Sequence, residues 1–360
     1  MINVAIIGSQ GVPAAYGGFE SLVENLIGDN CPPDIHYTVF CSSKDMEPYE
    51  GGEYRGATLR YVPLHANGIQ SIPYDVLSML RSLRGYDAIL VLGVSGCLFL
   101  PLIRKMTRAR IIVNIDGLEH RRQKWGNMAR RILRASEAMA VRYADIVVGD
   151  NQGIIDYVRD TYGKAAVLIA YGGDQVIRDV DCDVAASVLG SYGLAKQSYA
   201  VSLCRIEPEN NCEMILDSFA GAESSLPLVF IGNWHHSAYA QSLRLKYAGS
   251  PGIHILDAIY DLDKLWVIRS HAALYVHGHS AGGTNPSLVE AMYAGVPIAA
   301  YDVNYNRYTT GGHASYFSDC PSLRKIASSP DATQGRALRE HALQQYRWAD
   351  IARQYAALFR

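Results

Sequence analysis

The sequence has few charged residues and no Cys-x-x-Cys motif, and both features narrow the class of protein to which it can belong. Charged residues make up 19% of its 360 residues and the formal net charge is −2, which excludes a general electrostatic attraction to nucleic acid. The seven cysteines are odd in number and include no Cys-x-x-Cys pair, so we expect reduced thiols in a cytoplasm. The apolar share of 49% fits a folded globular protein, and a chain of this length suits two domains.

A basic leader and a long apolar run are also missing. Residues 2–7 run straight into a glycine turn, so we expect no signal peptide. The one candidate for a membrane span, residues 88–103, has sixteen uncharged residues, whereas a helix needs about 20 to cross a bilayer. Glycines divide this run, so we expect a buried strand, a turn and a buried helix there.

Short apolar runs alternate with helix-length segments along the chain, which is typical of doubly wound α/β domains. The runs that predict strands are 2–7, 36–41, 57–63, 87–92, 110–114, 146–148 and 167–170, then 199–203, 226–231, 253–256, 272–276 and 297–301. We therefore predict two Rossmann-like domains, over residues 1–170 and 171–345, with a linker at 171–175. Apolar residues at helical spacing predict a last helix within 346–360.

A glycine loop over residues 279–285 follows one predicted strand and leads into a helix with Pro286 in its first turn. This helix is expected to end at Gly295. Free backbone N–H groups and the positive end of the helix dipole meet at such a loop and suit an anionic ligand. Glu290, about one turn into the helix, can accept hydrogen bonds from sugar hydroxyls.

A second glycine loop, residues 8–18, precedes an amphipathic helix that begins near Phe19. It contains Gly17 and Gly18 but not the G-x-G-x-x-G spacing of a dinucleotide fingerprint, which disfavours a dehydrogenase. Taken alone, the loop fits an ordinary strand-to-helix turn equally well.

The first of these loops carries a family resemblance. Residues 282–292 read Gly-Gly-Thr-Asn-Pro-Ser-Leu-Val-Glu-Ala-Met and are followed by Gly-Val-Pro at 295–297. This segment resembles the donor-binding signature of family 4 glycosyltransferases and is most similar to their bacterial rhamnosyltransferase branch. The broader family has a glutamate where this chain has Gly282. The resemblance implies a GT-B fold, in which an acceptor-binding domain and a nucleotide-sugar-binding domain face each other across a cleft and the last helix crosses back to the first domain.

Residues 202–211, Ser-Leu-Cys-Arg-Ile-Glu-Pro-Glu-Asn-Asn, extend the resemblance. The family usually places an arginine and, five residues later, a lysine here to grip the donor diphosphate. Arg205 matches the arginine, whose guanidinium can bind two phosphate oxygens, and Asn210 stands at the lysine position. The donor-binding residues implied by the resemblance are Gly17, Gly18, Arg205, Glu209, Asn210, His279, Ser280, Gly282, Gly283, Thr284, Asn285 and Glu290.

Residues 111–120 end a predicted strand of the first domain in a polar cluster. Asp116, Glu119 and His120 are candidates for orienting an acceptor hydroxyl or assisting proton transfer, and Tyr16 is a further acceptor-side candidate. The resemblance favours Asp116 and Glu119 as acceptor-side residues with a catalytic part, alongside Arg205. A turn aspartate that caps the next segment explains Asp116 equally well.

Residues 104–142 carry eleven Lys or Arg against three acidic residues. The helix predicted within this stretch also has an apolar stripe at Met128, Ile132, Ala135 and Met139. This combination predicts contact with an anionic membrane surface, peripheral on the inner face of the cell membrane. A solvated helix face is the alternative.

Taken with the resemblance, these features predict a glycosyltransferase that moves L-rhamnose from dTDP-L-rhamnose to a hydroxyl of a polyprenyl-diphosphate-linked glycan in surface polysaccharide biosynthesis. Retention of configuration is implied only by the family. No cofactor and no metal are expected, because His235-His236 and His277-x-His279 lack a third ligand. Three alternatives stay open: another UDP- or GDP-hexose as donor, a nucleotide-sugar epimerase, and a non-catalytic nucleotide-sugar binder.

Overall fold

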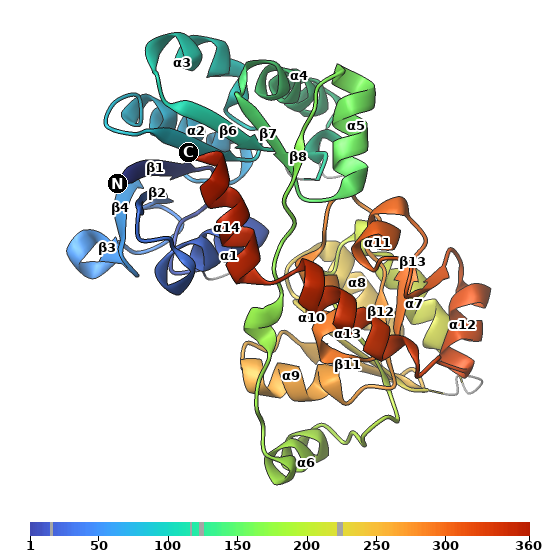
Figure 1. The fold of residues 1–360 in the computed structure, drawn as a ribbon. Helices are drawn as coiled ribbons and strands as arrows, with labels where there is room; N and C mark the ends of the chain where they lie inside the picture. Colours follow the sequence, from blue (N-terminus) through green and yellow to red (C-terminus); the bar gives the residue numbers. More distant parts are fainter. Residues whose placement is uncertain (15–16, 116, 122–125, 222–225) are drawn as a thin grey trace. The chain divides into compact units, whose positions relative to one another are not determined.

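A computed structural model describes residues 1–14, 17–115, 117–121, 126–221 and 226–360. The chain divides into two compact units: unit 1 comprises Met1–Tyr171 and Trp348–Arg360, and unit 2 comprises Gly172–Arg347. Each unit has one sheet with helices on both of its faces (Figure 1). Both are Rossmann-like, as the alternation of strand and helix patterns predicted.

Eight strands of unit 1 form a sheet in the order β3-β4-β2-β1-β5-β6-β7-β8. The strands are β1 (Ile2–Ile7), β2 (Ile35–Ser42), β3 (Glu53–Tyr54), β4 (Ala57–Val62), β5 (Ala88–Leu92), β6 (Arg110–Asn114), β7 (Ile146–Gly149) and β8 (Val167–Leu168). All pairs are parallel except β3 with β4. After β1 the chain adds β2 on one side of this strand and later adds β5 on the other side. The sheet therefore has a topological switch point between β1 and β5.

The helices of unit 1 cover both faces of this sheet (Figure 1). They are α1 (Gly18–Leu26), η1 (Gly28–Asn30), η2 (Glu50–Gly52), η3 (Gly68–Gln70), α2 (Ser71–Arg81), η4 (Cys97–Phe99), α3 (Leu100–Met106), η5 (Glu119–Arg121), α4 (Asn127–Tyr143), α5 (Gln152–Tyr162) and α14 (Trp348–Leu358). The uncharged run at 88–103 is therefore strand, turn and helix, as predicted. Among the described residues, no helix is long and apolar enough to cross a membrane.

Helix α14 returns from the far end of the chain to unit 1, as the resemblance implied. It packs beside α1, and Trp348, Ile351 and Tyr355 are buried in the same core as β1 and β2. The hydroxyl of Tyr355 accepts a hydrogen bond of 2.8 Å from Nδ2 of Asn114, a buried residue at the end of β6. The last residues of the chain thus complete the first core.

The sheet of unit 2 has the order β11-β10-β9-β12-β13-β14, and all of its pairs are parallel. The strands are β9 (Ala200–Leu203), β10 (Leu228–Gly232), β11 (Ile253–Asp257), β12 (Leu274–His277), β13 (Ile298–Tyr301) and β14 (Ser315–Phe317). β9 lies between β10 and β12, so this sheet has its switch point between β9 and β12.

Helices α7, α8 and α12 build the core on one face of this sheet, and α9, α10 and α13 pack together. The helices of unit 2 are η6 (Asp174–Val176), α6 (Cys182–Ser191), η7 (Pro208–Asn210), α7 (Cys212–Phe219), α8 (Ala238–Tyr247), α9 (Leu262–Ser270), α10 (Pro286–Ala294), α11 (Asn304–Thr309), α12 (Cys320–Ser328) and α13 (Gln334–Gln345). Two short strands, β3 and β14, had no apolar run long enough to predict them.

Candidate active site

Two loops leave the sheet of unit 2 at its switch point. One follows β9 and contains Arg205, and the other follows β12 and leads into α10. Neighbouring parallel strands bring the loops at their carboxyl ends together, and α/β folds bind ligands at such a position. The sheet order therefore joins the two segments that the sequence singled out, although they are about seventy residues apart.

Side-chain and backbone hydrogen bonds tie these two loops into one structure. Nδ2 of Asn210 donates to the carbonyl of Arg205 at 2.7 Å, and Oδ1 of Asn210 accepts from Nδ1 of His279 at 2.6 Å. The carbonyl of Glu209 accepts from the backbone N–H and from the hydroxyl of Ser280, both at 2.8 Å. Five of the predicted donor residues thus form one cluster, in which the Asn210 side chain is buried.

Gly278 lets the two loops approach this closely. A Cβ at this position would lie 2.1 Å from the backbone oxygen of Asn210, which is inside any allowed contact distance. The carbonyl of Gly278 also accepts from Nδ2 of Asn211 at 2.8 Å. The sequence analysis did not single out Gly278, because only the packing of the second loop against the first reveals the need for a glycine.

The start of α10 has the predicted features of an anion site. Oδ1 of Asn285 caps the helix by accepting from the N–H of Ser287 at 3.0 Å. Gly283, with φ of 99°, turns the loop in a conformation that side chains disfavour. Thr284 is buried, and Gly295 ends the helix in the left-handed region, as predicted. The N–H groups of the first turn therefore lie at the carboxyl end of β12.

Glu290, in the middle of α10, has both carboxylate oxygens engaged. Oε2 forms an ion pair of 2.9 Å with the guanidinium of Arg269, which is 2% exposed, and Oε1 accepts from Nε2 of Gln175 at 3.1 Å. The side chain of Glu290 is still 20% exposed, so solvent reaches part of it. Neither Arg269 nor Gln175 stood out in the sequence, where each is one polar residue in an unremarked segment.

Arg205 contrasts with its surroundings because its side chain is exposed. Its backbone is held by Asn210 and by the N–H of Glu207, while its guanidinium makes no hydrogen bond or ion pair with the part of the chain that the structure describes. A cation with a fixed backbone and five unused N–H donors is suited to a phosphate ligand.

His277, the last residue of β12, contributes no positive charge to this site. Burial lowers the pKa of His277 to about 3, so its imidazole is neutral at physiological pH. Burial likewise raises the pKa of the neighbouring Tyr275 to about 12. Arg205 carries a fixed positive charge at the first of these loops, and the buried Arg269 carries another, which Glu290 compensates.

The glycine loop of unit 1 leaves the switch point between β1 and β5. A Cβ on Gly8 would lie 2.0 Å from the carbonyl oxygen of Leu92, which fixes this glycine beside the end of β5. The carboxylate of Glu20 folds back from α1 and accepts from the N–H of Gln10 at 2.8 Å, and a Cβ on Gly17 would lie 1.9 Å from it. Gly17 and Gly18 therefore lie at the start of α1, where an internal carboxylate already occupies part of the loop. Tyr16 lies outside the described residues.

The segment after β6 holds the remaining candidates. Asp116 lies outside the described residues, and Glu119 and His120 belong to η5, which packs against α4. Nδ1 of His120 donates to Oε2 of Glu137 in α4 at 3.0 Å. Nε2 of His120 makes no hydrogen bond with the described part of the chain.

Glu137 is itself 1% exposed and is the centre of a buried network. Its Oε1 accepts hydrogen bonds of 2.7 Å from the hydroxyls of Tyr157 and Tyr162 in α5. With His120 on the other oxygen, three donors satisfy this buried carboxylate. The sequence showed Glu137 only as one of three acids in the basic stretch, and the sequence analysis assigned it no role.

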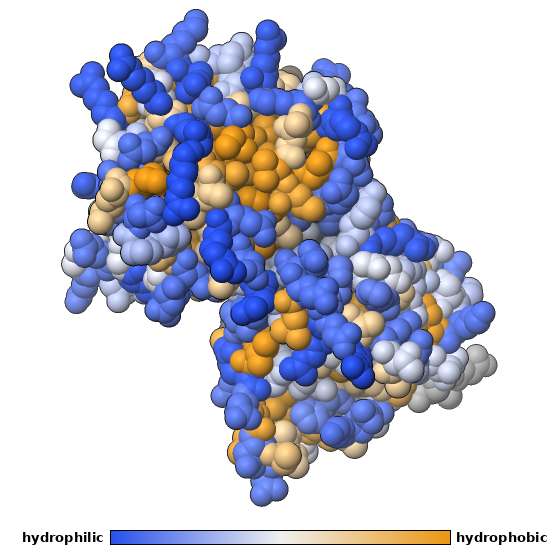
Figure 2. Space-filling view, viewed as in Figure 1, coloured by the Kyte–Doolittle hydropathy of each residue, from blue (hydrophilic) through white to orange (hydrophobic). Residues whose placement is uncertain are grey.

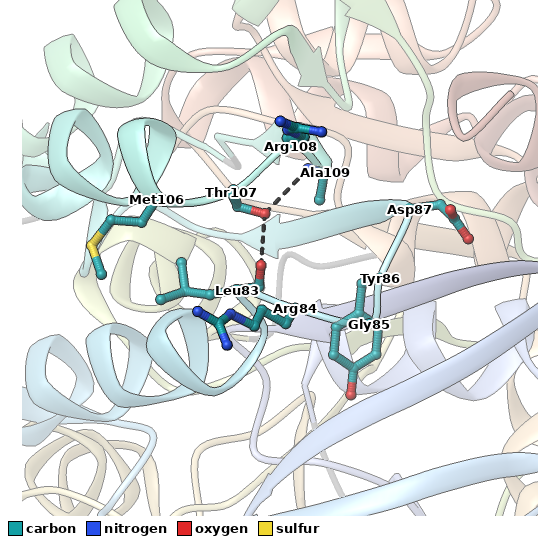
Figure 3. Close-up of a pocket in the computed structure, with 9 residues that line it drawn as sticks. All are labelled: Leu83, Arg84, Gly85, Tyr86, Asp87, Met106, Thr107, Arg108 and Ala109. Carbon is teal, nitrogen blue, oxygen red and sulfur yellow. Dashed lines mark hydrogen bonds between the residues drawn. The ribbon is translucent and has the colours of Figure 1, made fainter.

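The depression shown in Figure 3 lies elsewhere in unit 1. Residues before β5 and before β6 line it, so it is at the amino ends of these strands, opposite to the edge where α/β folds bind ligands. Thr107 holds it together: its hydroxyl donates to the carbonyl of Leu83 and accepts from the N–H of Ala109, both at 3.1 Å. We interpret it as a junction between two helix-to-strand turns.

No group of three or more potential metal ligands occurs among the residues that the structure describes. His235 and His277, from the two histidine pairs, take other roles: His235 lies beside Arg244 and Asp257, and His277 is buried in a strand end.

Two family models match the chain. Residues 1–174 match a domain of unknown function, DUF1972, and residues 191–320 match the model described as glycosyl transferases group 1. No curated protein matches. The second model spans both loops of the switch point of unit 2, including Arg205, Asn210, Gly283 and Glu290.

Solved structures share the architecture of the whole chain. A sucrose-phosphate synthase from Thermosynechococcus elongatus has a TM-score of 0.82 at 18% identity, over 100% of this chain and 98% of that one. Anabaena HepE in complex with UDP has a TM-score of 0.76 at 14% identity, over 99% of both chains. The catalytic domain of starch synthase IV from Arabidopsis thaliana, bound to ADP and acarbose, has a TM-score of 0.71 at 13% identity, over 99% and 98%. These similarities confirm the GT-B fold.

Proposed function

We propose that this chain, a glycosyltransferase whose residues 191–320 match the group 1 model, transfers L-rhamnose from dTDP-L-rhamnose to a hydroxyl of a polyprenyl-diphosphate-linked glycan. The observation that carries the proposal is the cluster at the switch point of unit 2, where Arg205, Asn210 and His279 are held beside the start of α10. Similar structures contain UDP, UDP-glucose and ADP, which supports a nucleotide sugar as donor.

On the donor side, Arg205 and the N–H groups of residues 282–285 would bind the diphosphate. Glu290 would accept a hydrogen bond from the sugar of the nucleoside, while Arg269 fixes its position. Asn210 would act by positioning Arg205 and His279, because its buried amide already bonds to both. The choice of rhamnose as the transferred sugar rests on the resemblance of the Gly-Gly-Thr-Asn-Pro-Ser segment to the rhamnosyltransferase branch, and on Gly282 where the broader family has a second glutamate.

On the acceptor side, Asp116, Glu119, His120 and Tyr16 of unit 1 would orient the attacking hydroxyl. His120 is the best defined of these, because the buried Glu137 holds its Nδ1 and its Nε2 makes no hydrogen bond within the described chain. Gly17 and Gly18 would offer backbone N–H groups to the donor diphosphate.

In the transfer, the bond between the anomeric carbon and the diphosphate oxygen breaks and a bond to the acceptor oxygen forms. The hydroxyl proton leaves with the departing diphosphate or a nearby base, and negative charge builds up on the phosphate. A guanidinium and helix N–H groups can stabilise this charge, so we propose a reaction without metal and, by family, with retention.

A thermal-shift panel in EDTA would test the donor. The full chain is melted with dTDP-rhamnose, UDP-glucose, GDP-mannose, NAD or buffer. At a hundred times its Kd, the donor should stabilise the protein by about 2.7 kcal/mol, which is a rise in Tm of about 2–4 °C. A shift with NAD alone, or with no compound, would contradict the proposal.

Turnover then separates the alternatives. Release of dTDP that depends on an added glycan acceptor supports the transferase. Conversion of the sugar without an acceptor would indicate an epimerase, and binding without either reaction would indicate a non-catalytic binder. The departures at Asn210 and Gly282 from the broad family are the reason to test for that last outcome.

A further inference from the structure

Helix α4 of unit 1 exposes apolar side chains along one face. Met128 is 70% exposed and Ile132 is 37% exposed, and Ala135 also faces solvent. Their spacing of four and three residues puts them on one side of the helix, while Leu133 and Glu137 are buried on the other side. The structure confirms the predicted helix and shows that its apolar stripe is not used in the core.

The preceding segment enlarges this apolar surface. The hydroxyl of Ser136 in α4 donates to the carbonyl of Val94 and accepts from the N–H of Leu98 at 2.9 Å, so η4 lies directly against α4. From η4 and α3, four more apolar side chains reach solvent. We define the α3–α4 strip as Leu98, Phe99, Leu102, Met106, Met128 and Ile132, which are exposed by 36%, 45%, 54%, 50%, 70% and 37%.

Basic side chains accompany the strip on both helices. Lys105 in the last turn of α3 and Arg108 just after this helix are exposed, and so are Arg131, Arg134 and Arg142 on α4. Figure 2 shows hydrophilic side chains projecting from the region where Figure 1 places α3 and α4.

On α3, Arg104 is paired with Asp145 at 2.9 Å, whereas the five cations named above form no ion pair in the described part of the chain. Neither residues 98–108 nor the described part of 127–143 exposes an acid, because Glu137 is the one acidic residue in these ranges and it is buried. An exposed apolar strip with positive charge beside it matches the interface of an anionic bilayer, where apolar groups enter the acyl boundary and cations stay at the phosphates.

We propose that the α3–α4 strip docks unit 1 onto an anionic lipid membrane. An acidic protein partner would match the arginines but would not require exposed Phe99, Leu102 and Met128 around them. The inference goes beyond the proposed reaction, because membrane docking needs no turnover. It also bears on that reaction, since α4 positions His120 through Glu137 and would bring this side chain close to a lipid-linked acceptor.

Vesicle flotation of the full chain, without any substrate, tests the proposal. Vesicles of phosphatidylcholine alone are compared with vesicles that also contain phosphatidylglycerol. We expect binding only to the second kind. Changing Arg131→Gln and Arg134→Gln together should lower the partition coefficient about thirtyfold, and so should raising the salt concentration strongly. Changing Leu102→Ser and Met128→Ser together should lower it at least tenfold.

Matched controls come from unit 2. Leu245→Ser removes an apolar side chain that is 79% exposed, and Arg336→Gln removes a cation whose side chain is 88% exposed. Neither should change vesicle binding, and an unchanged Tm in all variants shows that they fold. Equal binding to neutral vesicles, no binding, or binding that depends on the arginines but not on Leu102 and Met128 would each overturn the proposal. Docking without transfer would leave it standing and would count against the proposed reaction alone.

Discussion

Arg205 combines a fixed backbone with an unoccupied guanidinium, and this contrast is what a binding residue requires. Its carbonyl is bound by Asn210, whereas its side chain is exposed and without a partner in the described chain. Asn210 stands where the family has a lysine, and its buried amide cannot supply that positive charge. In the proposed donor site, Arg205 would therefore contribute more of the binding to an anionic donor than the family pattern alone implies.

Changing Arg205→Gln should weaken binding of the nucleotide-sugar donor by about 10- to 150-fold, because a hydrogen bond to a charged group is worth about 1.5–3 kcal/mol. Arg205→Lys keeps the charge but loses the two-point contact, so an intermediate loss is expected. Isothermal titration with the donor measures both. Arg336→Gln, on the exposed face of α13, is the control and should bind normally. An Arg205→Gln variant with unchanged affinity would remove this residue from the site.

At the scale of elements, the loops after β9 and β12 act as one unit because Gly278 allows contact between backbones. The glycine has no Cβ to separate the two loops. Hydrogen bonds from His279 to Asn210 and from Ser280 to the carbonyl of Glu209 then join them. The order of strands in the sheet determines that these two loops meet, and the glycine determines how closely they meet.

Changing Gly278→Ala should separate the two loops, because its Cβ would lie 2.1 Å from the backbone oxygen of Asn210. Overpacking of this kind costs about 1–3 kcal/mol of unfolding free energy. Donor affinity should also fall at least tenfold or so, since the Asn210–His279 bond is strained. Gly190→Ala in α6 is the matched control: apart from its own helix backbone and chain neighbours, no described atom would lie within 4 Å of the new Cβ, so the change should stabilise the helix by up to about 1 kcal/mol. Urea unfolding would show whether Gly278→Ala lowers the unfolding free energy while Gly190→Ala raises it. Donor titration would show whether only Gly278→Ala weakens donor binding.

The same elements show how far the sequence could lead. Apolar runs predicted β1, β6 and the helix that starts at Pro286, because buried parallel strands and capped helices have strong local signals. β14 was missed, since three residues at a sheet edge give almost no periodicity. Arg269 and Glu137 were also missed, because their importance lies in partners distant in sequence. Local patterns carry no information about which buried charge will meet which.

At the scale of the whole molecule, the hydrophobic core of unit 1 is complete only when the last helix of the chain, α14, packs against it. Trp348, Ile351 and Tyr355 of α14 are buried against β1, β2 and α1, so the first core depends on a segment made after the whole of unit 2. The bond from Asn114 to Tyr355 connects this helix to the end of β6. The segment that leads to Glu119 and His120 in η5 begins directly after that point.

Changing Tyr355→Phe tests whether α14 supports the acceptor side. Asn114 is 1% exposed, and the loss of an acceptor for its Nδ2 should cost unit 1 about 1–3 kcal/mol. Hydrogen exchange measured by mass spectrometry should show faster exchange in peptides of β5 and β6 and in residues 117–121, with unit 2 unchanged. Tyr260→Phe, at a side chain that is 75% exposed in unit 2, should leave all peptides unchanged. If exchange rises equally in both units, α14 stabilises the chain generally. If it rises only beside α14, a specific bond from the end of the chain holds the end of β6, which the proposed acceptor residues follow in sequence.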